Sequence, residues 1–159
     1  MAETHEGPLM SSILHLLHRA GQAADELFAT EMQGSDLTPR QYAVLVVLAE
    51  HENASQTDIV NATGIDRSTL ADIVKRLVDR GLLARRRSKL DARAYSVRLT
   101  AAGQSALKST QPVAAKVEDR ILRTLPVAHR NSLIDSLATI VRSQNREEDE
   151  PPVLLRARR

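Results

Sequence analysis

A cluster of cationic side chains in the middle of the chain is the feature of this sequence with the clearest chemical meaning. Between residues 75 and 98 nine residues are Lys or Arg, and only Asp79 and Asp91 are acidic. The basic residues are Lys75, Arg76, Arg80, Arg85, Arg86, Arg87, Lys89, Arg93 and Arg98. The formal charge of the whole chain is only +2, so the positive charge is concentrated in this segment. Such concentration indicates a polyanion-binding surface, and the alternative is a solvated charged face.

Other kinds of chemistry find little support in the composition. The chain has no Cys, which excludes disulfides and thiolate metal sites and makes the cytoplasm the expected compartment. Two Tyr and one Phe are too few to form a stacking platform for single-stranded nucleic acid. No nucleophile and base arrangement and no glycine-rich phosphate loop is found, so we expect neither catalysis nor a cofactor. No apolar run approaches the roughly 20 residues of a membrane crossing, so no membrane partner is expected.

The spacing of apolar residues predicts the helices that must position these cations. Apolar residues recur every three or four positions over residues 9–28, which predicts a first helix of about 20 residues. Thr38 followed by Pro39 predicts the cap and first turn of a second helix that runs to about His51. Ser55 is expected to cap a short third helix that ends at Thr63.

A tight turn is predicted between the third helix and a fourth. Gly64 suits the left-handed position that ends a helix, and Asp66 can cap the next one. The inward residues of this fourth helix are expected to be Leu70, Ile73, Val74 and Leu77. Two short helices joined by a glycine turn form a helix-turn-helix, although helical hairpins also occur in unrelated bundles.

After Gly81 the apolar period changes from that of a helix to that of a strand. Tyr95, Val97 and Leu99 alternate with polar residues and predict a strand, whose antiparallel partner spans residues 83–87 with a loop over 88–92. A basic two-stranded ribbon directly after a helix-turn-helix makes a winged helix.

The remainder is predicted to be helical and then to end in a tail. Thr100 is expected to cap a fifth helix, which Pro112 should kink or split. Its expected inward residues are Ala102, Ala106, Val113, Val117, Ile121 and Leu125. A sixth helix follows Pro126 and runs to about Ser143. The predicted fold class is therefore mainly α, with six helices and a two-stranded β wing in a single domain over residues 1–143, and a mobile tail over residues 144–159.

Three segments of the chain combine into a recognisable pattern. They are LTPRQYAVLVVLAE (37–50), SQTDIVNATGIDRSTLADIVKRLVDRGLL (55–83) and DARAYSVRLTAAG (91–103). In this order and spacing they resemble the second helix, the helix-turn-helix and the Asp-x-Arg wing of the MarR family of bacterial transcription regulators. The resemblance covers residues 9–143 and implies a homodimer formed by the N- and C-terminal helices, about 9–30 and 101–143. It also implies paired winged helices, about 37–99, on double-stranded DNA with a pseudo-palindromic operator.

The second helix of a helix-turn-helix presents its first residues to base edges in the major groove. Here these residues are Arg67, Ser68, Thr69 and, one turn further, Asp72. Arg can bind guanine through two hydrogen bonds, and hydroxyl groups reach bases or phosphates. The alternative is that Ser68 and Thr69 only cap the helix together with Asp66.

Phosphate contacts are expected around this reading surface. Lys75 and Arg76 lie a further turn along the helix, and Arg86 and Lys89 belong to the ribbon, although alternate residues of a strand point to opposite faces. The resemblance implies that Arg93 enters the minor groove as the arginine of the Asp-x-Arg motif. It also implies that Asp91 orients the wing by pairing with a neighbouring arginine.

Many members of the family release DNA when a small, often aromatic, anion enters the crevice between the dimerisation helices and the winged helix. The resemblance therefore implies an effector, for which the candidate residues are His15, His18, Arg19, Arg40 and Tyr42. The alternative is an exposed polar role for each, or for Tyr42 a place in the core. His15 and His18 also have the spacing of a two-histidine metal site, but no carboxylate lies nearby on that face, so no metal is expected.

Two further functional classes stay open from the sequence. An effector-blind architectural or adaptor protein would use the same winged helix without a ligand pocket, whereas a regulator needs one. An enzyme would have to build its site from scattered His and Asp residues. Because repression is the more frequent mode in the family, the expected function is a ligand-released repressor.

Overall fold

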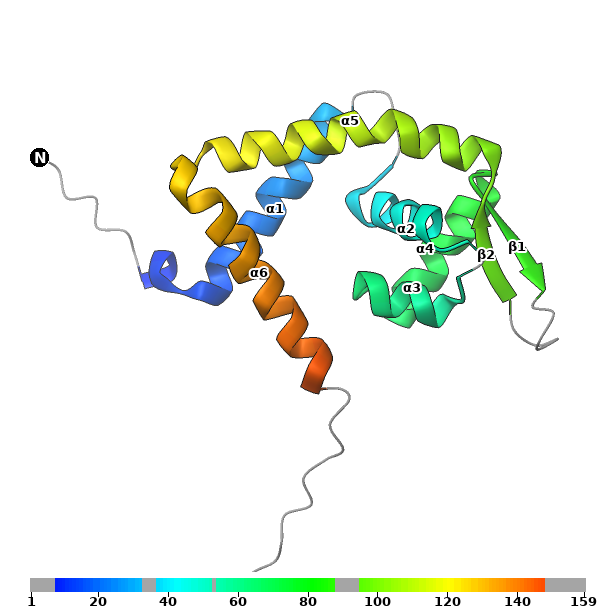
Figure 1. Ribbon diagram of the computed structural model, residues 1–159, viewed down its shortest axis with the longest axis horizontal. Coiled ribbons are helices and arrows are strands. Elements are labelled where there is room, and N and C mark those ends of the chain that lie inside the picture. Colours follow the sequence, from blue (N-terminus) through cyan, green and yellow to red (C-terminus); the bar gives the residue numbers. More distant parts are fainter. Residues whose placement is uncertain (1–7, 33–36, 53, 88–94, 148–159) are drawn as a thin grey trace, which may run out of the picture. The chain divides into compact units, whose positions relative to one another are not determined.

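The computed structural model describes residues 8–32, 37–52, 54–87 and 95–147. Within them the chain forms six α-helices and one two-stranded sheet, as predicted, and a short 3-10 turn before the first helix (Figure 1). The elements are η1 (Pro8–Ser11), α1 (Ile13–Glu31), α2 (Pro39–Glu50), α3 (Gln56–Thr63), α4 (Arg67–Asp79), β1 (Leu83–Arg87), β2 (Tyr95–Leu99), α5 (Ala101–Arg123) and α6 (Val127–Glu147).

The chain divides into two compact units, Met1–Glu118 and Asp119–Arg159. The first unit holds η1, α1, the winged helix and most of α5, and the second holds the end of α5 and α6. The single domain predicted over residues 1–143 stays a prediction. The sixth helix extends four residues past the predicted end at Ser143, and residues 148–159 of the predicted tail lie outside the described residues.

Side-chain caps fix where the helices of the winged helix begin, and the predicted caps are confirmed. The Thr38 hydroxyl accepts from the Gln41 N–H while the Gln41 side chain accepts from the Thr38 N–H, a reciprocal capping box. Ser55 and Asp58 form the same arrangement at α3. At the first helix the prediction was incomplete, because Ser12 caps α1 and separates it from η1.

The turn between α3 and α4 depends on a left-handed residue. Gly64 has φ of 67°, and its N–H donates to the Val60 carbonyl over 2.8 Å, which ends α3. Residues that carry a Cβ adopt this conformation at a cost. Two residues later Asp66 caps α4, so the two helices form the predicted helix-turn-helix.

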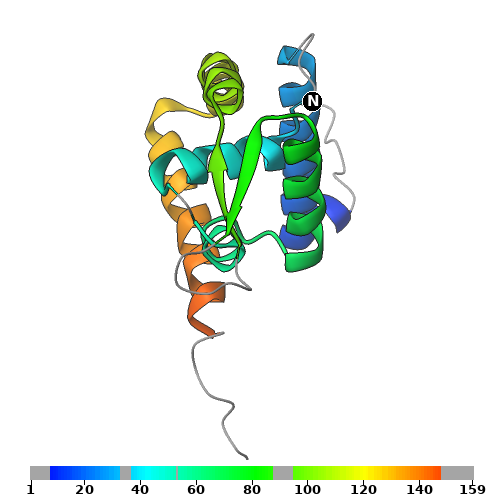
Figure 2. The same cartoon turned by 90° about the vertical axis from the view of Figure 1, so that its right-hand side faces the viewer.

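The strands pair antiparallel, as predicted, and their register runs from Leu83 opposite Leu99 to Arg87 opposite Tyr95. The ribbon is joined to the segment before α3, where the N–H of Val97 in the middle of β2 donates to the Ala54 carbonyl over 3.1 Å. α2 contacts α3 and β2, α3 contacts α4 and β2, and α4 contacts β1. Figure 2 shows the ribbon beside α4 in this arrangement.

α5 begins where the chain leaves the ribbon, and a close backbone approach sets its rotation. The Thr100 hydroxyl donates to the Gly81 carbonyl over 2.7 Å and accepts from the Gly103 N–H over 3.0 Å. A Cβ at Gly103 would stand 2.1 Å from the Leu82 carbonyl oxygen. The helix can therefore lie against the residue before β1 only because position 103 has no side chain.

This rotation differs from the predicted one. The residues of α5 that are buried are Gly103, Leu107, Thr110, Ala114 and Val117, of which only Val117 was predicted to face inward. Ala102 is exposed, and Ala106 and Val113 are half-buried. The prediction assigned the buried face from the positions of apolar residues. The close contact at Gly103 instead buries a face that is shifted by about one residue along most of the helix.

Pro112 does not split α5, so that alternative of the prediction is wrong. One helix runs from Ala101 to Arg123 with Pro112 inside it. Proline removes the amide that would bond the carbonyl of Lys108. Both Pro112 and Lys108 are exposed, so water can hydrate that carbonyl and the helix continues.

The core of the first unit is formed by the inward sides of α2, α3 and α4 and by the ribbon. The side chains of Val44, Leu45, Leu48, Ile59, Leu70, Val74, Leu77 and Val97 have 1% or less of their surface exposed. Leu70, Ile73, Val74 and Leu77 are all buried on α4, as predicted. This core holds α4 by one side and leaves its other side in solvent.

Candidate nucleic-acid interface

The side of α4 opposite its buried residues carries the side chains predicted to contact DNA. Arg67, Ser68, Asp72, Lys75 and Arg76 are exposed, and Thr69 is half-buried. At about 100° per residue, Ser68, Asp72 and Lys75 lie on one face and Arg67 lies to one side of it. The structure therefore presents the predicted residues of α4 to solvent along a single helix.

The cap of α4 uses part of this polar chemistry. Asp66 Oδ1 accepts from the Ser68 hydroxyl over 2.6 Å and from the Thr69 N–H over 2.9 Å. The hydrogen bonds from Ser68, and then from Thr69, hold the pKa of Asp66 far below its usual range. Ser68 thus takes part in capping, which was the alternative role predicted for it. Its exposed oxygen can still accept a hydrogen bond, whereas Thr69 offers less surface.

The ribbon adds cations next to the recognition helix. Arg86 lies opposite Ser96, and Ala84 lies opposite Arg98, so Arg86 and Arg98 share one face of the ribbon because side chains alternate along a strand. Arg85 is exposed and points to the other face. Lys89, Asp91 and Arg93 lie outside the described residues, and their predicted roles in the wing stay predictions.

The predicted effector residues of α1 lie on or near its surface. His15 is half-buried, and His18 and Arg19 are exposed. One nitrogen of the Arg19 guanidinium donates to the Gln22 side chain over 3.1 Å. These three side chains are available to a ligand along the polar side of the helix.

The two candidates on α2 face different surroundings. The ring of Tyr42 packs against Phe28 of α1 with centroids 6.0 Å apart, and burial, with a smaller effect of Glu118, raises the pKa of its hydroxyl. Arg40 instead lines a pocket of about 390 Å³ with Ala43 and the turn between α3 and α4. Within one chain the structure therefore does not bring Arg40 and Tyr42 together.

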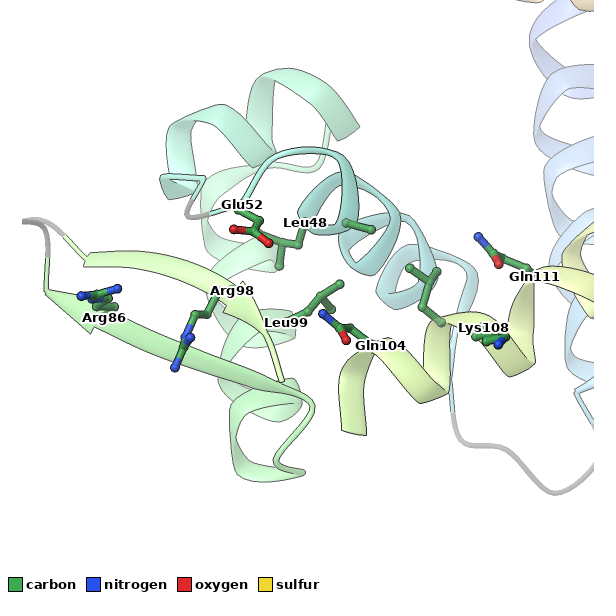
Figure 3. Close-up of a pocket in the computed structure, with 10 residues that line it drawn as sticks. Leu48, Glu52, Arg86, Arg98, Leu99, Gln104, Lys108 and Gln111 are labelled. Atoms are coloured by element: carbon green, nitrogen blue, oxygen red, sulfur yellow. The ribbon is translucent and has the colours of Figure 1, made fainter. Parts of the chain in front are cut away.

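A larger pocket lies between the end of α2, the ribbon and the first turns of α5 (Figure 3). Its volume is about 590 Å³, and its lining includes Arg86, Arg98, Gln104 and Lys108. Arg86 was predicted as a site residue and Arg98 as part of the basic cluster, but Gln104 and Lys108 were not predicted. The sequence does place these two residues together, because residues 104, 108 and 111 have the spacing of one helix face.

Two other kinds of site find no support in the part of the chain that the structure describes. No group of three or more His, Asp or Glu residues there is placed to hold a metal ion. None of the described helices has both the length and the hydrophobicity that crossing a membrane requires.

Comparison with known proteins places these features in a family of regulators. The family model for the MarR family matches residues 35–94, which include α2, the helix-turn-helix and β1. The putative transcriptional regulatory protein for the hcr operon of Thauera aromatica is 28% identical over 157 residues, covering 98% of this chain and 92% of that protein.

Solved structures of regulators have the same fold. Bordetella bronchiseptica BpsR, whose DNA binding is regulated by 6-hydroxynicotinic acid, has a TM-score of 0.78 and 30% identity over 82% of this chain and 94% of BpsR. The transcriptional repressor CouR bound to a 23-mer DNA duplex has a TM-score of 0.79 and 32% identity over 88% of this chain and 99% of CouR. CouR is also known bound to p-coumaroyl-CoA.

Proposed function

The chain belongs to the MarR family, and from this membership we propose that it is a homodimeric, sequence-specific regulator of transcription that binds double-stranded DNA and works in the cytoplasm. The family is one of DNA-binding regulators rather than enzymes. The observation that carries the proposal is the solvent-facing side of α4, with its cations and hydroxyls, beside a basic ribbon. CouR, which shares this fold, binds a duplex.

We assign reading of bases to the first turns of α4 and attraction to phosphate to the cations around them. Arg67, Ser68, Thr69 and Asp72 stand where a recognition helix meets base edges. Lys75, Arg76 and Arg86 are exposed further out, and Lys89 and Arg93 would extend this surface along the wing. A pseudo-palindromic duplex whose half-sites lie about one helical turn, roughly 10 base pairs, apart then fits the two-fold symmetry of a homodimer.

The test begins by selecting an operator from a randomised duplex pool with the full-length protein. Arg67→Ala should relax discrimination at particular base pairs by roughly 1 to 3 kcal/mol. Arg86→Ala should weaken binding to all sequences and lower the salt slope by about one in each subunit. Arg142→Ala is the matched control, because it removes an exposed cation of α6 and should change neither quantity. If no sequence is enriched, the proposal of specific DNA binding is wrong.

Dimerisation is supported by apolar side chains that a single chain leaves in solvent. Leu9, Met10, Ile13, Leu14 and Leu17 are between 37% and 67% exposed on η1 and α1. On α6 the exposed apolar residues are Val127, Ile134, Leu137, Ile140 and Val141. Apolar surface of this extent marks an interaction site, and a second copy of the chain is the partner that the family membership supports.

Sedimentation at low micromolar concentration should show about 35 kDa, twice the 17.5 kDa of one chain. Ile140→Glu should shift the equilibrium toward monomer while each chain keeps its fold, because the side chain is 45% exposed. A wild-type protein that sediments mainly as a folded monomer would contradict the dimer.

We further propose that the protein is a repressor released by a small organic anion of aromatic or acyl type. BpsR responds to an aromatic acid and CouR binds an acyl thioester. The residues assigned to this role are His15, His18, Arg19, Arg40 and Tyr42, and in the homodimer they would come from two chains. A ligand must favour the released state by about 5.5 kcal/mol to convert 99% occupancy into 1%, or about half of that at each of two sites.

A thermal-shift screen of aromatic acids and their acyl thioesters, followed by a gel shift with each hit, tests this role. Arg19→Ala should blunt release of the operator and leave the DNA affinity without ligand unchanged, whereas Arg142→Ala should change neither. If every ligand that binds leaves DNA affinity unchanged, an effector-blind architectural function replaces the repressor.

A further inference from the structure

The pocket between α2, the ribbon and α5 is not explained by the proposed contacts to bases or by the candidate effector residues. It is formed within the first unit by the end of α2 and the residues just after it, by the ribbon and by the first turns of α5. Its lining includes Leu48, Glu52, Arg86, Arg98, Gln104 and Lys108. None of the residues assigned to the effector lines it. Its volume of about 590 Å³ is that of a small-molecule site.

The charges of this pocket are divided between its two ends. Arg86 and Arg98 lie on the ribbon at one end, and Lys108 lies on α5 toward the other (Figure 3). Glu52, two residues after the end of α2, is drawn on the ribbon side of the pocket in the same view. Two guanidinium groups and one carboxylate leave the ribbon end with one net positive charge, and the ammonium group gives the α5 end another. The pocket therefore suits two negative groups held apart.

The middle of the pocket is apolar with one amide. Leu48 and Leu99 lie between the charged ends together with Gln104 (Figure 3). A sphere of the same volume would be roughly 10 Å across, which is close to the roughly 9 Å length of an extended eight-carbon chain with C–C bonds of about 1.5 Å. We propose that this pocket is a second ligand site, and that it binds an organic dianion with an apolar middle.

Such a ligand would weaken the binding of DNA, and this part of the inference rests on the proposed function. Arg86 lines the pocket and is also one of the residues assigned to DNA phosphates. One guanidinium cannot neutralise a ligand carboxylate and a phosphate equally well at the same time. Because coupling between two ligands is reciprocal, the dianion weakens DNA binding and DNA weakens binding of the dianion.

Titration calorimetry on the DNA-free, full-length protein tests the site itself, with suberate as the dianion and octanoate as its singly charged counterpart. Suberate should bind about tenfold more tightly, which corresponds to about 1.4 kcal/mol. Lys108→Gln should remove this preference and leave suberate and octanoate about equal. Lys116→Gln is the matched control, because it removes a Lys of the same helix that pairs with Glu31 and lies outside the pocket.

A second variant tests the space rather than the charge. Gln104 is exposed, so Gln104→Trp can fill the middle of the pocket without disturbing the core, and it should abolish binding of both acids. The proposal is overturned if wild-type protein binds neither acid, if Lys108→Gln keeps the tenfold preference, or if Gln104→Trp binds suberate as wild type does.

The coupling is measured as the affinity for a fluorescent 30-base-pair duplex at low salt, with and without suberate. The samples without suberate receive chloride to the same ionic strength. Suberate at ten times its Kd should weaken duplex binding at least twofold, up to the roughly elevenfold limit of full competition. Arg86→Gln should bind the duplex more weakly and lose the response to suberate. If bound suberate leaves the duplex affinity unchanged, the proposed competition is wrong. If the protein binds no duplex at all, the proposed function is wrong, and the calorimetric result alone then tests the ligand site.

Discussion

Replacing Gly103 by Ala tests whether close backbone packing, rather than apolar side chains, fixes the rotation of α5. The added Cβ would stand 2.1 Å from the Leu82 carbonyl oxygen and 3.1 Å from a methyl carbon of Leu99. Ordinary contacts of a Cβ begin at about 3.4 Å. The backbone of α5 and the residue before β1 must therefore separate by more than 1 Å.

This separation acts on the hydrogen bonds at the same place. The Thr100 N–H donates to the Leu82 carbonyl over 3.1 Å, and the Gly103 N–H donates to the Thr100 hydroxyl over 3.0 Å. Overpacking costs about 1 to 3 kcal/mol, and each weakened hydrogen bond costs about 1 kcal/mol. After about 1 kcal/mol is returned by the better helix propensity of Ala, the free energy of unfolding should fall by about 3 kcal/mol.

Urea unfolding followed by far-UV circular dichroism, at one fixed protein concentration, measures this change. Gly21→Ala is the matched control, because nothing lies within 4 Å of a Cβ at that position inside α1. It should raise stability by about 0.5 to 1 kcal/mol. If Gly103→Ala also raises stability, or changes it by less than about 0.5 kcal/mol, then close packing at Leu82 does not set the rotation of α5.

Three further predictions concern caps, a buried hydroxyl and a proline. The pKa values of Asp58 and Asp66 are lowered by their capping hydrogen bonds. The stability that these carboxylates contribute is therefore present above the unfolded pKa of about 3.9 and is lost as the pH falls below it. Asp58→Asn and Asp66→Asn should reduce this loss of stability at acid pH, measured by unfolding at a series of pH values. The pKa of Tyr42 is raised, so its contribution is present below about pH 10 and is lost at higher pH; Tyr42→Phe should reduce the alkaline loss of stability. Pro112→Ala should raise the free energy of unfolding by about 2 kcal/mol, because it restores an amide donor for the carbonyl of Lys108 in a continuous helix. If the urea midpoint does not rise, neighbouring structure depends on the proline.

The elements predicted correctly are those that local sequence decides. Thr38, Ser55 and Asp66 have side chains that bond amides three residues ahead, and such caps depend on a few consecutive residues. The alternation around Val97 fixes the face of the strand in the same way. Because these interactions are short-range, the residue types alone were enough to locate the helix-turn-helix and the ribbon.

The places where prediction and structure differ involve partners that are distant in sequence. The rotation of α5 depends on the close approach of Leu82 to Gly103. The spacing of apolar residues within α5 carries no information about this contact with a residue outside the helix. Pro112 was expected to kink or split the helix because it lacks an amide donor. The helix is not split, because Pro112 and Lys108 are exposed and water can replace the missing donor.

The same division holds for the candidate sites. The sequence alone determined which residues of α4 are polar and which are apolar, and hence which side of this helix is buried. Only the tertiary structure decided that Arg40 faces the helix-turn-helix turn while Tyr42 packs on Phe28. It alone also brought Glu52, Arg98 and Lys108 around one pocket. A helix or strand sets the direction of each side chain relative to its own axis, but the packing of the elements sets which directions converge.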